Sequence, residues 1–244
     1  MFKSGFTLFR QTLRTVALAC TLAATAVHAQ NSAMPPVPDI GAKGYMLLDL
    51  TTGQTLAELN SHQRLEPASL TKLMTAYLVF SALQNKQIKL DQQVPVSPTA
   101  WKAEGSRMFI EPNKPVNVEE LLYGMIVQSG NDATRALAEL LGGDESNFAN
   151  LMNQQAKRLG MNESNFRNAS GLPDPQHYTT ANDLSILARR IIQDFPSYYK
   201  MYSTKEYTYN GIRQPNRNRL LWIDSSVDGM KTGHTDAAGY CLVS

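Results

Sequence analysis

The sequence predicts a mixed α/β fold, more closely α+β, in which strands from both ends of the chain form an antiparallel sheet and a helical lobe is inserted between them. Strand-like runs cluster near the two ends, and segments with helical periodicity fill the middle. We expect a cleft where the sheet meets the helical lobe. The chain of 244 residues stops inside a strand-like run, which predicts a domain that is incomplete at its C-terminal end.

The first 29 residues have the composition of an export signal rather than of a folded segment. A basic start is followed by an apolar run over residues 15–27, and Val27 and Ala29 are the small residues that signal peptidase reads. Acylation of Cys20 in a lipoprotein is the alternative, but Ala17 stands where a larger aliphatic residue is usual. We therefore predict cleavage after Ala29.

Removal of this leader reverses the net charge. The whole chain has 23 Lys and Arg against 21 Asp and Glu, and the leader holds three of the basic residues and no acidic one. The remaining chain has 20 against 21, a net charge of −1, so the sequence gives no support to nucleic-acid binding. Cys241 is then the single cysteine, and no internal disulfide can form.

The predicted elements begin with an extended tether over residues 30–43, where three prolines stand in a polar setting. Two apolar-rich runs, 45–50 and 54–59, are separated by a Thr-Thr-Gly turn and predict a β-hairpin. A helix is predicted over residues 69–84, directly after a Pro-Ala pair. Its residues are apolar on nearly every side, so we expect it to be central.

The middle of the chain is predicted to be helical because its apolar residues recur every three or four positions. Phe148, Met152 and Ala156, for example, share one face. Asn117 and Glu120 have the spacing of a capping box. The further predicted helices cover residues 119–128, 132–141, 144–159 and 181–195, and the predicted strands after them cover 207–209, 227–232 and 239–243.

The first chemical pattern is Ser-Leu-Thr-Lys at residues 69–72. On a helix Ser69 and Lys72 share a face, and the free N–H groups of the first turn favour developing negative charge. Lys72 is the only charged residue from Ser69 to Asn85, so we expect it to be buried, with a lowered pKa, and able to act as a base. The alternative is a lysine that extends to solvent from a buried helix. A second Ser-x-x-Lys pattern, at residues 197–200, is not followed by further catalytic motifs at suitable distances.

The second pattern, Ser129-Gly130-Asn131, falls on a tight turn between two predicted helices. The Ser129 hydroxyl could relay a proton between Lys72 and a leaving nitrogen, and the Asn131 amide could hold a peptide carbonyl. The alternative is an ordinary turn that caps the helix at Asp132.

The third pattern, Lys231-Thr232-Gly233, falls in a predicted strand. Lys231 and the Thr232 hydroxyl suit a carboxylate. Gly233 has no side chain, so a peptide could approach the strand edge and pair with it. The alternative is a strand that runs into a Thr-Gly turn.

Together the three strings, in this order and 60 and 102 residues apart, resemble the penicillin-recognising serine enzymes, the superfamily of β-lactamases and transpeptidases. The surrounding sequence is similar to that of the D-alanyl-D-alanine carboxypeptidases, the penicillin-binding proteins of low molecular mass. The resemblance runs from about residue 44 to the end. It is carried by residues 67–72, 128–133, 216–218 and 228–236.

This resemblance implies a transpeptidase-like domain over residues 44–244. It implies an acyl transfer in which Ser69 is the nucleophile, Lys72 the general base and Ser129 the proton relay. The backbone N–H groups of Ser69 and His234 are implied to form the oxyanion hole. Arg217 is implied to bind the terminal carboxylate of the substrate. The alternative, of equal weight, is that Arg217 is a solvated arginine on a loop.

The implied substrate is a peptidoglycan stem peptide that ends in D-Ala-D-Ala, and β-lactams are the implied covalent inhibitors. No cofactor or metal is implied. The implied location is the periplasm, at the outer face of the inner membrane. Members of the family continue with further strands and often with a domain that ends in a membrane-surface helix, so peripheral membrane association would use a segment beyond Ser244.

Three alternatives share the motifs. A D,D-endopeptidase of the same fold differs in cleft width, which the sequence does not give. A class A β-lactamase needs a glutamate on the loop below the cleft, and residues 168–180 offer only Asp174. A non-catalytic penicillin-binding sensor would not need Ser69, Lys72, Ser129 and Lys231 together.

Overall fold

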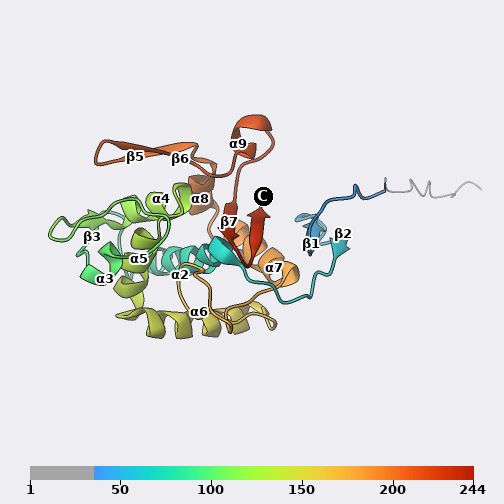
Figure 1. The fold of residues 1–244 in the computed structure, drawn as a ribbon, viewed down its shortest axis with the longest axis horizontal. Helices are drawn as coiled ribbons and strands as arrows, with labels where there is room; N and C mark the ends of the chain where they lie inside the picture. The colour runs from blue at the N-terminus through green and yellow to red at the C-terminus, as the bar shows by residue number, and fades with distance from the viewer. Residues whose placement is uncertain (1–35) are drawn as a thin grey trace, which may run out of the picture. The chain divides into compact units, whose positions relative to one another are not determined.

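The structure, a computed structural model, describes residues 36–244 (Figure 1). The predicted export signal and the first residues of the predicted tether lie outside the described residues. Residues 36–40 belong to a separate unit, are exposed and contain no helix or strand. Residues 41–244 form the second unit, which contains every named element and all of the three strings.

Strands, helices and strands follow one another along the chain in the predicted order (Figure 1). The first hairpin pairs β1 (Tyr45–Leu48) with β2 (Thr55–Leu59) in antiparallel register. The helical part comprises η1 (Ala68–Thr71), α2 (Lys72–Gln84), α3 (Pro98–Trp101), α4 (Val118–Val127), α5 (Asn131–Gly142), α6 (Glu145–Leu159), α7 (Ala181–Asp194), α8 (Pro196–Tyr199) and η2 (Lys200–Ser203), with a short ladder of β3 (Gln93–Val94) and β4 (Val116–Asn117). The last part comprises β5 (Glu206–Tyr209), β6 (Ile212–Pro215), α9 (Leu220–Ile223), β7 (Lys231–Thr235) and β8 (Gly239–Val243).

The α+β class and the inserted helices are confirmed, but the expected single sheet is divided. Within the described residues β1 pairs only with β2, and β7 pairs only with β8, each as a two-stranded antiparallel ladder. The first hairpin packs against α7 and does not extend the second ladder. The face of β8 is correspondingly open, with Tyr240 93% exposed.

Helix α2 is the centre of the core, as its all-round apolar sequence predicts. Leu73, Met74, Val79 and Phe80 have no exposed surface. The helix contacts α4, α5, α6 and α7, and Figure 1 shows it in the middle of the helical elements. Because it is enclosed on all sides, any polar group on it must find partners within the protein.

Among the described helices, none combines the length and the apolar character needed to cross a membrane.

Local signals begin and end the helices around this core. Asn117 accepts the N–H of Glu120 at 2.8 Å and Glu120 accepts the N–H of Asn117 at 3.0 Å, which confirms the capping box of α4. Helix α6 begins after Asp144, whose carboxylate accepts the N–H of Asn147, and it ends at Gly160 in the left-handed region.

Asp132, on the first turn of α5, is a buried carboxylate that the sequence analysis did not single out. It has no exposed surface and accepts the backbone N–H groups of Met108, Phe109 and Ile110 at 2.9, 2.8 and 3.2 Å. These bonds fasten an irregular segment without helix or strand to the start of α5. The segment carries Ser106, which lies beside the cleft described below.

Asp132→Ala should lower the free energy of unfolding by about 3 kcal/mol or more, because it leaves several buried N–H groups without an acceptor. The matched control is Asp144→Ala, which removes a helix cap at an exposed position and should cost about 1 kcal/mol. Urea denaturation of both variants measures the difference. An Asp132→Ala loss no larger than that of the control would contradict the structural role assigned to this carboxylate.

Candidate active site

The three sequence strings meet at one cleft of about 540 Å³. Ser69 reaches it from η1, Ser129 from the turn between α4 and α5, and Gly233 from β7. Lys72 and Lys231 lie behind its wall and are 1% and 2% exposed. The cleft is also lined by Ser106, Arg217, Thr232 and His234.

Ser69 and Lys72 face each other as the helical spacing predicts, although the turn that joins them is a 3₁₀ turn and the α-helix begins at Lys72. The Nζ atom of Lys72 lies 2.8 Å from Ser69 Oγ. It also donates to the carbonyl oxygen of Ser170 at 2.8 Å. Burial lowers the pKa of Lys72 well below its usual value, and the positive charges of Lys231 and Arg217 lower it further. A lowered pKa favours the neutral amine, which can accept a proton.

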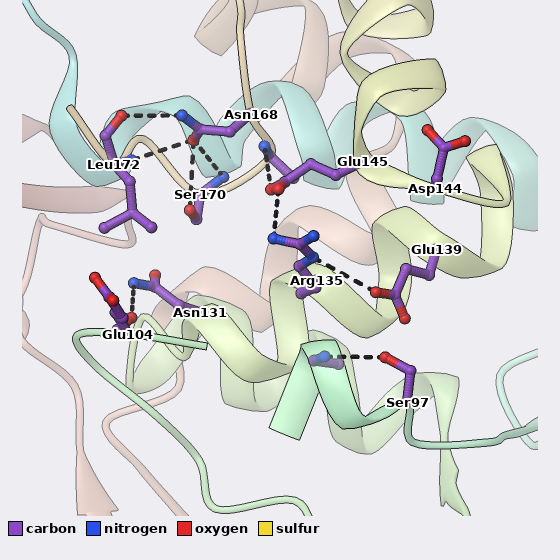
Figure 2. Close-up of polar contacts among 12 residues, drawn as sticks. Ser97, Glu104, Asn131, Arg135, Glu139, Asp144, Glu145, Asn168, Ser170 and Leu172 are labelled. Atoms are coloured by element: carbon purple, nitrogen blue, oxygen red, sulfur yellow. Dashed lines mark hydrogen bonds and ion pairs between the residues drawn. The ribbon is translucent and has the colours of Figure 1, made fainter. Parts of the chain in front are cut away.

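The carbonyl that holds Lys72 comes from the loop of residues 168–180, but the sequence analysis did not single out Ser170 or Asn168. Asn168 Oδ1 accepts the N–H groups of Ser170, Gly171 and Leu172 at 3.2, 2.7 and 3.1 Å (Figure 2). An asparagine whose side chain binds the backbone that follows it is typical of a turn, which was the only available signal. This turn holds the Ser170 carbonyl towards α2.

The second string is a strained turn without a side-chain cap. Ser129 is 4% exposed and has φ of 64°, which few residues other than glycine adopt. Helix α5 begins at Asn131 with Gly130 at its N-cap and no capping side chain, so the ordinary capping turn is not what forms. A Cβ at Gly130 would lie 2.9 Å from Asp132 Oδ1, which explains the glycine.

Asn131 lines a neighbouring pocket, together with Ser170, and is 7% exposed. Its Nδ2 donates to the carbonyl of Glu104 at 2.6 Å, which leaves a second N–H on the same nitrogen. Its Oδ1 is buried without a hydrogen-bond partner among the described residues. The amide therefore keeps one N–H donor that is not used within the described residues.

The third string lies on β7, as predicted. Lys231 Nζ donates to the carbonyl of Thr232 at 2.9 Å, and burial, aided by the charge of Arg217, lowers the pKa of Lys231 to about 7. A Cβ at Gly233 would come within 3.0 Å of the Ser69 nitrogen and 3.2 Å of the Pro67 oxygen. The glycine thus allows β7 to lie against η1, a reason that the sequence pattern did not reveal.

Arg217 is exposed but held in place beside the cleft. Its Nε donates to the carbonyl of Gln128 at 3.1 Å and its Nη2 donates to Ser106 Oγ at 2.9 Å. The residue that follows it is anchored in turn, since Asn218 Nδ2 donates to the carbonyl of Gly229 at 2.7 Å. The position differs from that of a freely solvated loop arginine.

A buried histidine supports the turn that carries Ser69. His177 Nε2 lies 2.9 Å from Thr71 Oγ1, and the N–H of Arg167 donates to His177 Nδ1 at 3.2 Å. Because Nδ1 accepts, the proton of the neutral ring is on Nε2 and donates to Thr71. Burial lowers the pKa of His177 to about 4.

Two other groups in the sequence analysis are placed away from this arrangement. The Ser197 and Lys200 pair is exposed on α8 and η2. Asp174, the acidic residue of loop 168–180, accepts the N–H of Gln176 at 2.7 Å and lies 3.8 Å from Arg167 Nε. Within residues 36–244 there is no group of three His, Cys, Asp or Glu side chains that could hold a metal ion.

Comparisons with known proteins agree with this geometry. The family described as D-alanyl-D-alanine carboxypeptidase matches residues 29–244. The chain is 45% identical over 214 residues to the D-alanyl-D-alanine carboxypeptidase DacC of Escherichia coli (85% of this chain, 54% of that protein). It is 46% identical over 211 residues to DacA of Haemophilus influenzae (85% and 54%). The chain therefore spans about half the length of the curated relatives it matches.

Solved structures show the same fold. Penicillin binding protein 5 from Haemophilus influenzae matches with a TM-score of 0.81 at 45% identity, over 84% of this chain and 61% of that chain. Penicillin binding protein 6B from Escherichia coli matches with a TM-score of 0.81 at 43% identity, over 86% and 68%. These likenesses confirm the transpeptidase-like fold expected from the sequence.

The buried imidazole of His177 should make the protein less stable in acid. Its pKa is about 4 in the folded protein, against 6.5 for an unperturbed histidine, so the unfolded state binds the proton more readily between these values. Stability from this group is complete above pH 6.5 and should fall by about 3 kcal/mol as the pH drops to 4. Denaturation of the wild type and of His177→Gln across this range measures the effect.

The matched control is His62→Gln, because the ion pair with Glu163 raises the pKa of the exposed His62 and gives its contribution the opposite sign. The His177→Gln variant should lose less stability than the wild type between pH 6.5 and 4. Parallel pH profiles for the wild type and His177→Gln would show that His177 does not cause the loss of stability in acid.

Proposed function

The chain belongs to the family of D-alanyl-D-alanine carboxypeptidases, and from this premise we propose that it is a serine carboxypeptidase that removes the terminal D-alanine from peptidoglycan stem peptides. The observation that carries the proposal is the 2.8 Å separation of Ser69 Oγ from the buried Nζ of Lys72. An amine with a lowered pKa at this distance can take the hydroxyl proton during attack.

In the proposed reaction Ser69 Oγ attacks the carbonyl carbon between the two D-alanines while its proton moves to Lys72 Nζ. The C–N bond then breaks, and the departing amine receives a proton through the Ser129 hydroxyl. A water molecule next attacks the ester, its proton returns through Lys72, and Ser69 is released with its hydroxyl restored. The backbone N–H groups of Ser69 and His234 would stabilise the negative oxygen at both steps.

The positive charges beside the cleft determine the orientation in which the proposed substrate binds. Arg217 and Lys231, with the Thr232 hydroxyl, form the side that suits the terminal carboxylate. A carboxylate there would also favour the charged form of Lys231, whose pKa is lowered to about 7 without a partner. The remaining N–H of Asn131 would bind the peptide carbonyl on the other side of the reacting bond. The stem of the peptide therefore extends past Asn131.

The proposal includes covalent inhibition by β-lactams, because they would acylate the same Ser69. Slow release of the drug is expected, since a free carboxylate to activate water is missing from the described part of the cleft wall. Glu145 lines a neighbouring pocket together with Ser170, but one of its oxygens pairs with Arg135 at 2.6 Å and the other accepts the N–H of Ala169. We further propose that the protein works after export, in the periplasm, where peptidoglycan stems are accessible.

Ser69→Ala should abolish both D-alanine release from an acyl-D-Ala-D-Ala peptide and covalent labelling by a fluorescent penicillin, since both need one nucleophile. The measurement uses full-length protein, with amino-acid analysis of the product and gel detection of the label. Ser197→Ala, in the second Ser-x-x-Lys pattern, is the matched control and should behave as wild type. Labelling that persists in Ser69→Ala would refute the assignment of the nucleophile.

Lys72→Arg should be nearly inactive even though the positive charge is kept, because a guanidinium does not lose its proton at working pH. In the wild type the rate of penicillin acylation should rise with pH as Lys72 loses its proton, and this rise should be absent from the variant. Stopped-flow acylation rates measure both. A variant rate within about tenfold of wild type, a difference of only ~1.4 kcal/mol, would place the base elsewhere.

A further inference from the structure

His177 is buried beside the candidate active site, and the proposed reaction does not use it. It is 3% exposed and lies on the loop that also supplies the Ser170 carbonyl to Lys72. Its Nε2 donates to Thr71 Oγ1 at 2.9 Å. Because Thr71 lies between Ser69 and Lys72 in the sequence, this bond acts on the short backbone segment that joins the proposed nucleophile to its base.

Two further side chains at the start of α2 bind the same loop. Lys72 Nζ donates to the Ser170 carbonyl at 2.8 Å. Thr75 Oγ1 donates to the Ala169 carbonyl at 2.7 Å. Both of these bonds go to backbone, whereas the bond from His177 depends on a side chain of the loop. A shift of the loop relative to α2 would change the direction in which the Lys72 amine points, so the register of the two segments affects the base.

The turn of Ser69 needs support because its backbone is strained. Ala68 has φ of 45°, which few residues other than glycine adopt, and such a conformation persists only where surrounding contacts fix it. The loop packs directly against this turn, since a Cβ at Gly171 would overlap the Ala68 oxygen and lie 2.8 Å from Thr71 Oγ1. Thr71 has no exposed surface, so its hydroxyl depends on partners within the protein.

The two nitrogens of the His177 ring make different contacts. Nε2 donates to Thr71 on the turn, whereas Nδ1 accepts the N–H of Arg167, just before the loop, at 3.2 Å. The ring also packs edge-on against Phe166, with the ring centroids 5.7 Å apart. One nitrogen thus serves the structure of the loop and the other joins the loop to the active-site turn, so substitutions can separate the two contacts.

We propose that His177 is a positioning residue for acylation, because its bond to Thr71 holds the turn of Ser69 in register with the loop. The inference rests on the proposed carboxypeptidase function and adds to it a residue outside the three strings. The groups assigned to the terminal carboxylate belong to β7 and to the segment after β6. Loss of the bond should therefore slow acylation without weakening the binding of the substrate.

Two substitutions of His177 separate the contacts of its ring. Glutamine has a side-chain N–H as many bonds from Cα as Nε2, so His177→Gln can still donate to Thr71. Asparagine has its side-chain oxygen as many bonds from Cα as Nδ1, so His177→Asn can still accept the N–H of Arg167 but does not reach Thr71. Both variants lose the aromatic ring, and the comparison between them isolates the bond to the turn.

Stopped-flow acylation by a fluorescent penicillin gives the rate constant of acylation and the dissociation constant of the preceding complex separately. In the full-length protein, His177→Asn should lower the rate constant about tenfold and change the dissociation constant less than about twofold. His177→Gln should stay within about threefold of wild type in both. The same order should hold for kcat of D-alanine release. His62→Gln, at an exposed histidine that does not line the cleft, is the matched control and should behave as wild type.

The partner on the turn supplies a second pair of variants. Thr71→Val keeps the branched shape and removes the acceptor, whereas Thr71→Ser keeps the hydroxyl. Thr71→Val should show the loss of His177→Asn, and Thr71→Ser should keep most of the rate. The double variant of His177→Asn and Thr71→Val should lose no more than either single variant, because both remove one bond. This pair decides the question if urea denaturation shows that His177→Asn does not fold.

An acylation rate constant of His177→Asn equal to that of His177→Gln would overturn the positioning role while the carboxypeptidase proposal stands. Additive losses in the double variant, or a loss confined to the dissociation constant, would overturn it as well. Failure of the wild type to be acylated and to release D-alanine would refute the proposed function, and the inference with it.

Discussion

The burial of one lysine in an otherwise apolar helix is the constraint on which the rest of the site depends. Lys72 is 1% exposed, and an ammonium at such a position is costly unless it loses its proton or finds partners. The described part of the protein supplies only two, Ser69 Oγ and the carbonyl of Ser170, and neither carries a negative charge. The surroundings thus favour the neutral amine, and the same burial that makes α2 a core helix gives its first residue the chemistry of a base.

Close approach of backbone to backbone is the second requirement, because the partners of Lys72 come from distant segments. Gly233 allows β7 to reach the turn of Ser69, since a Cβ there would lie 3.0 Å from the Ser69 nitrogen. Gly171 allows the loop of Ser170 to reach the same turn from the other side, since its Cβ would overlap the Ala68 oxygen. The hydrogen bond between His177 and Thr71 also stabilises this turn. The absence of a side chain at Gly233 and Gly171 therefore allows distant backbone segments to meet at the turn of Ser69.

Local physics explains which parts of this arrangement could be predicted from the sequence. The capping box at Asn117, the end of α6 at Gly160 and the apolar character of α2 depend on residues close in sequence, and the structure confirms them. The pairing of strands depends on long-range contacts, and the expected single sheet is present as separate ladders. Ser106 was missed for a similar reason, since it acts through the distant Arg217. The turn of Asn168 is local, but its link to Lys72 through the Ser170 carbonyl is a long-range contact that no charge or spacing marks.

Asn131 shows how a residue of one string depends on a loop that belongs to none of them. One N–H of its amide binds the Glu104 carbonyl, which leaves the other N–H for the peptide carbonyl of the proposed substrate. Its Oδ1 is buried without a hydrogen-bond partner among the described residues, which costs about 1–3 kcal/mol and leaves the bond to Glu104 as the contact that orients the amide. The orientation of this amide therefore depends on the backbone of a loop outside the three strings, a contact that the sequence patterns alone do not reveal.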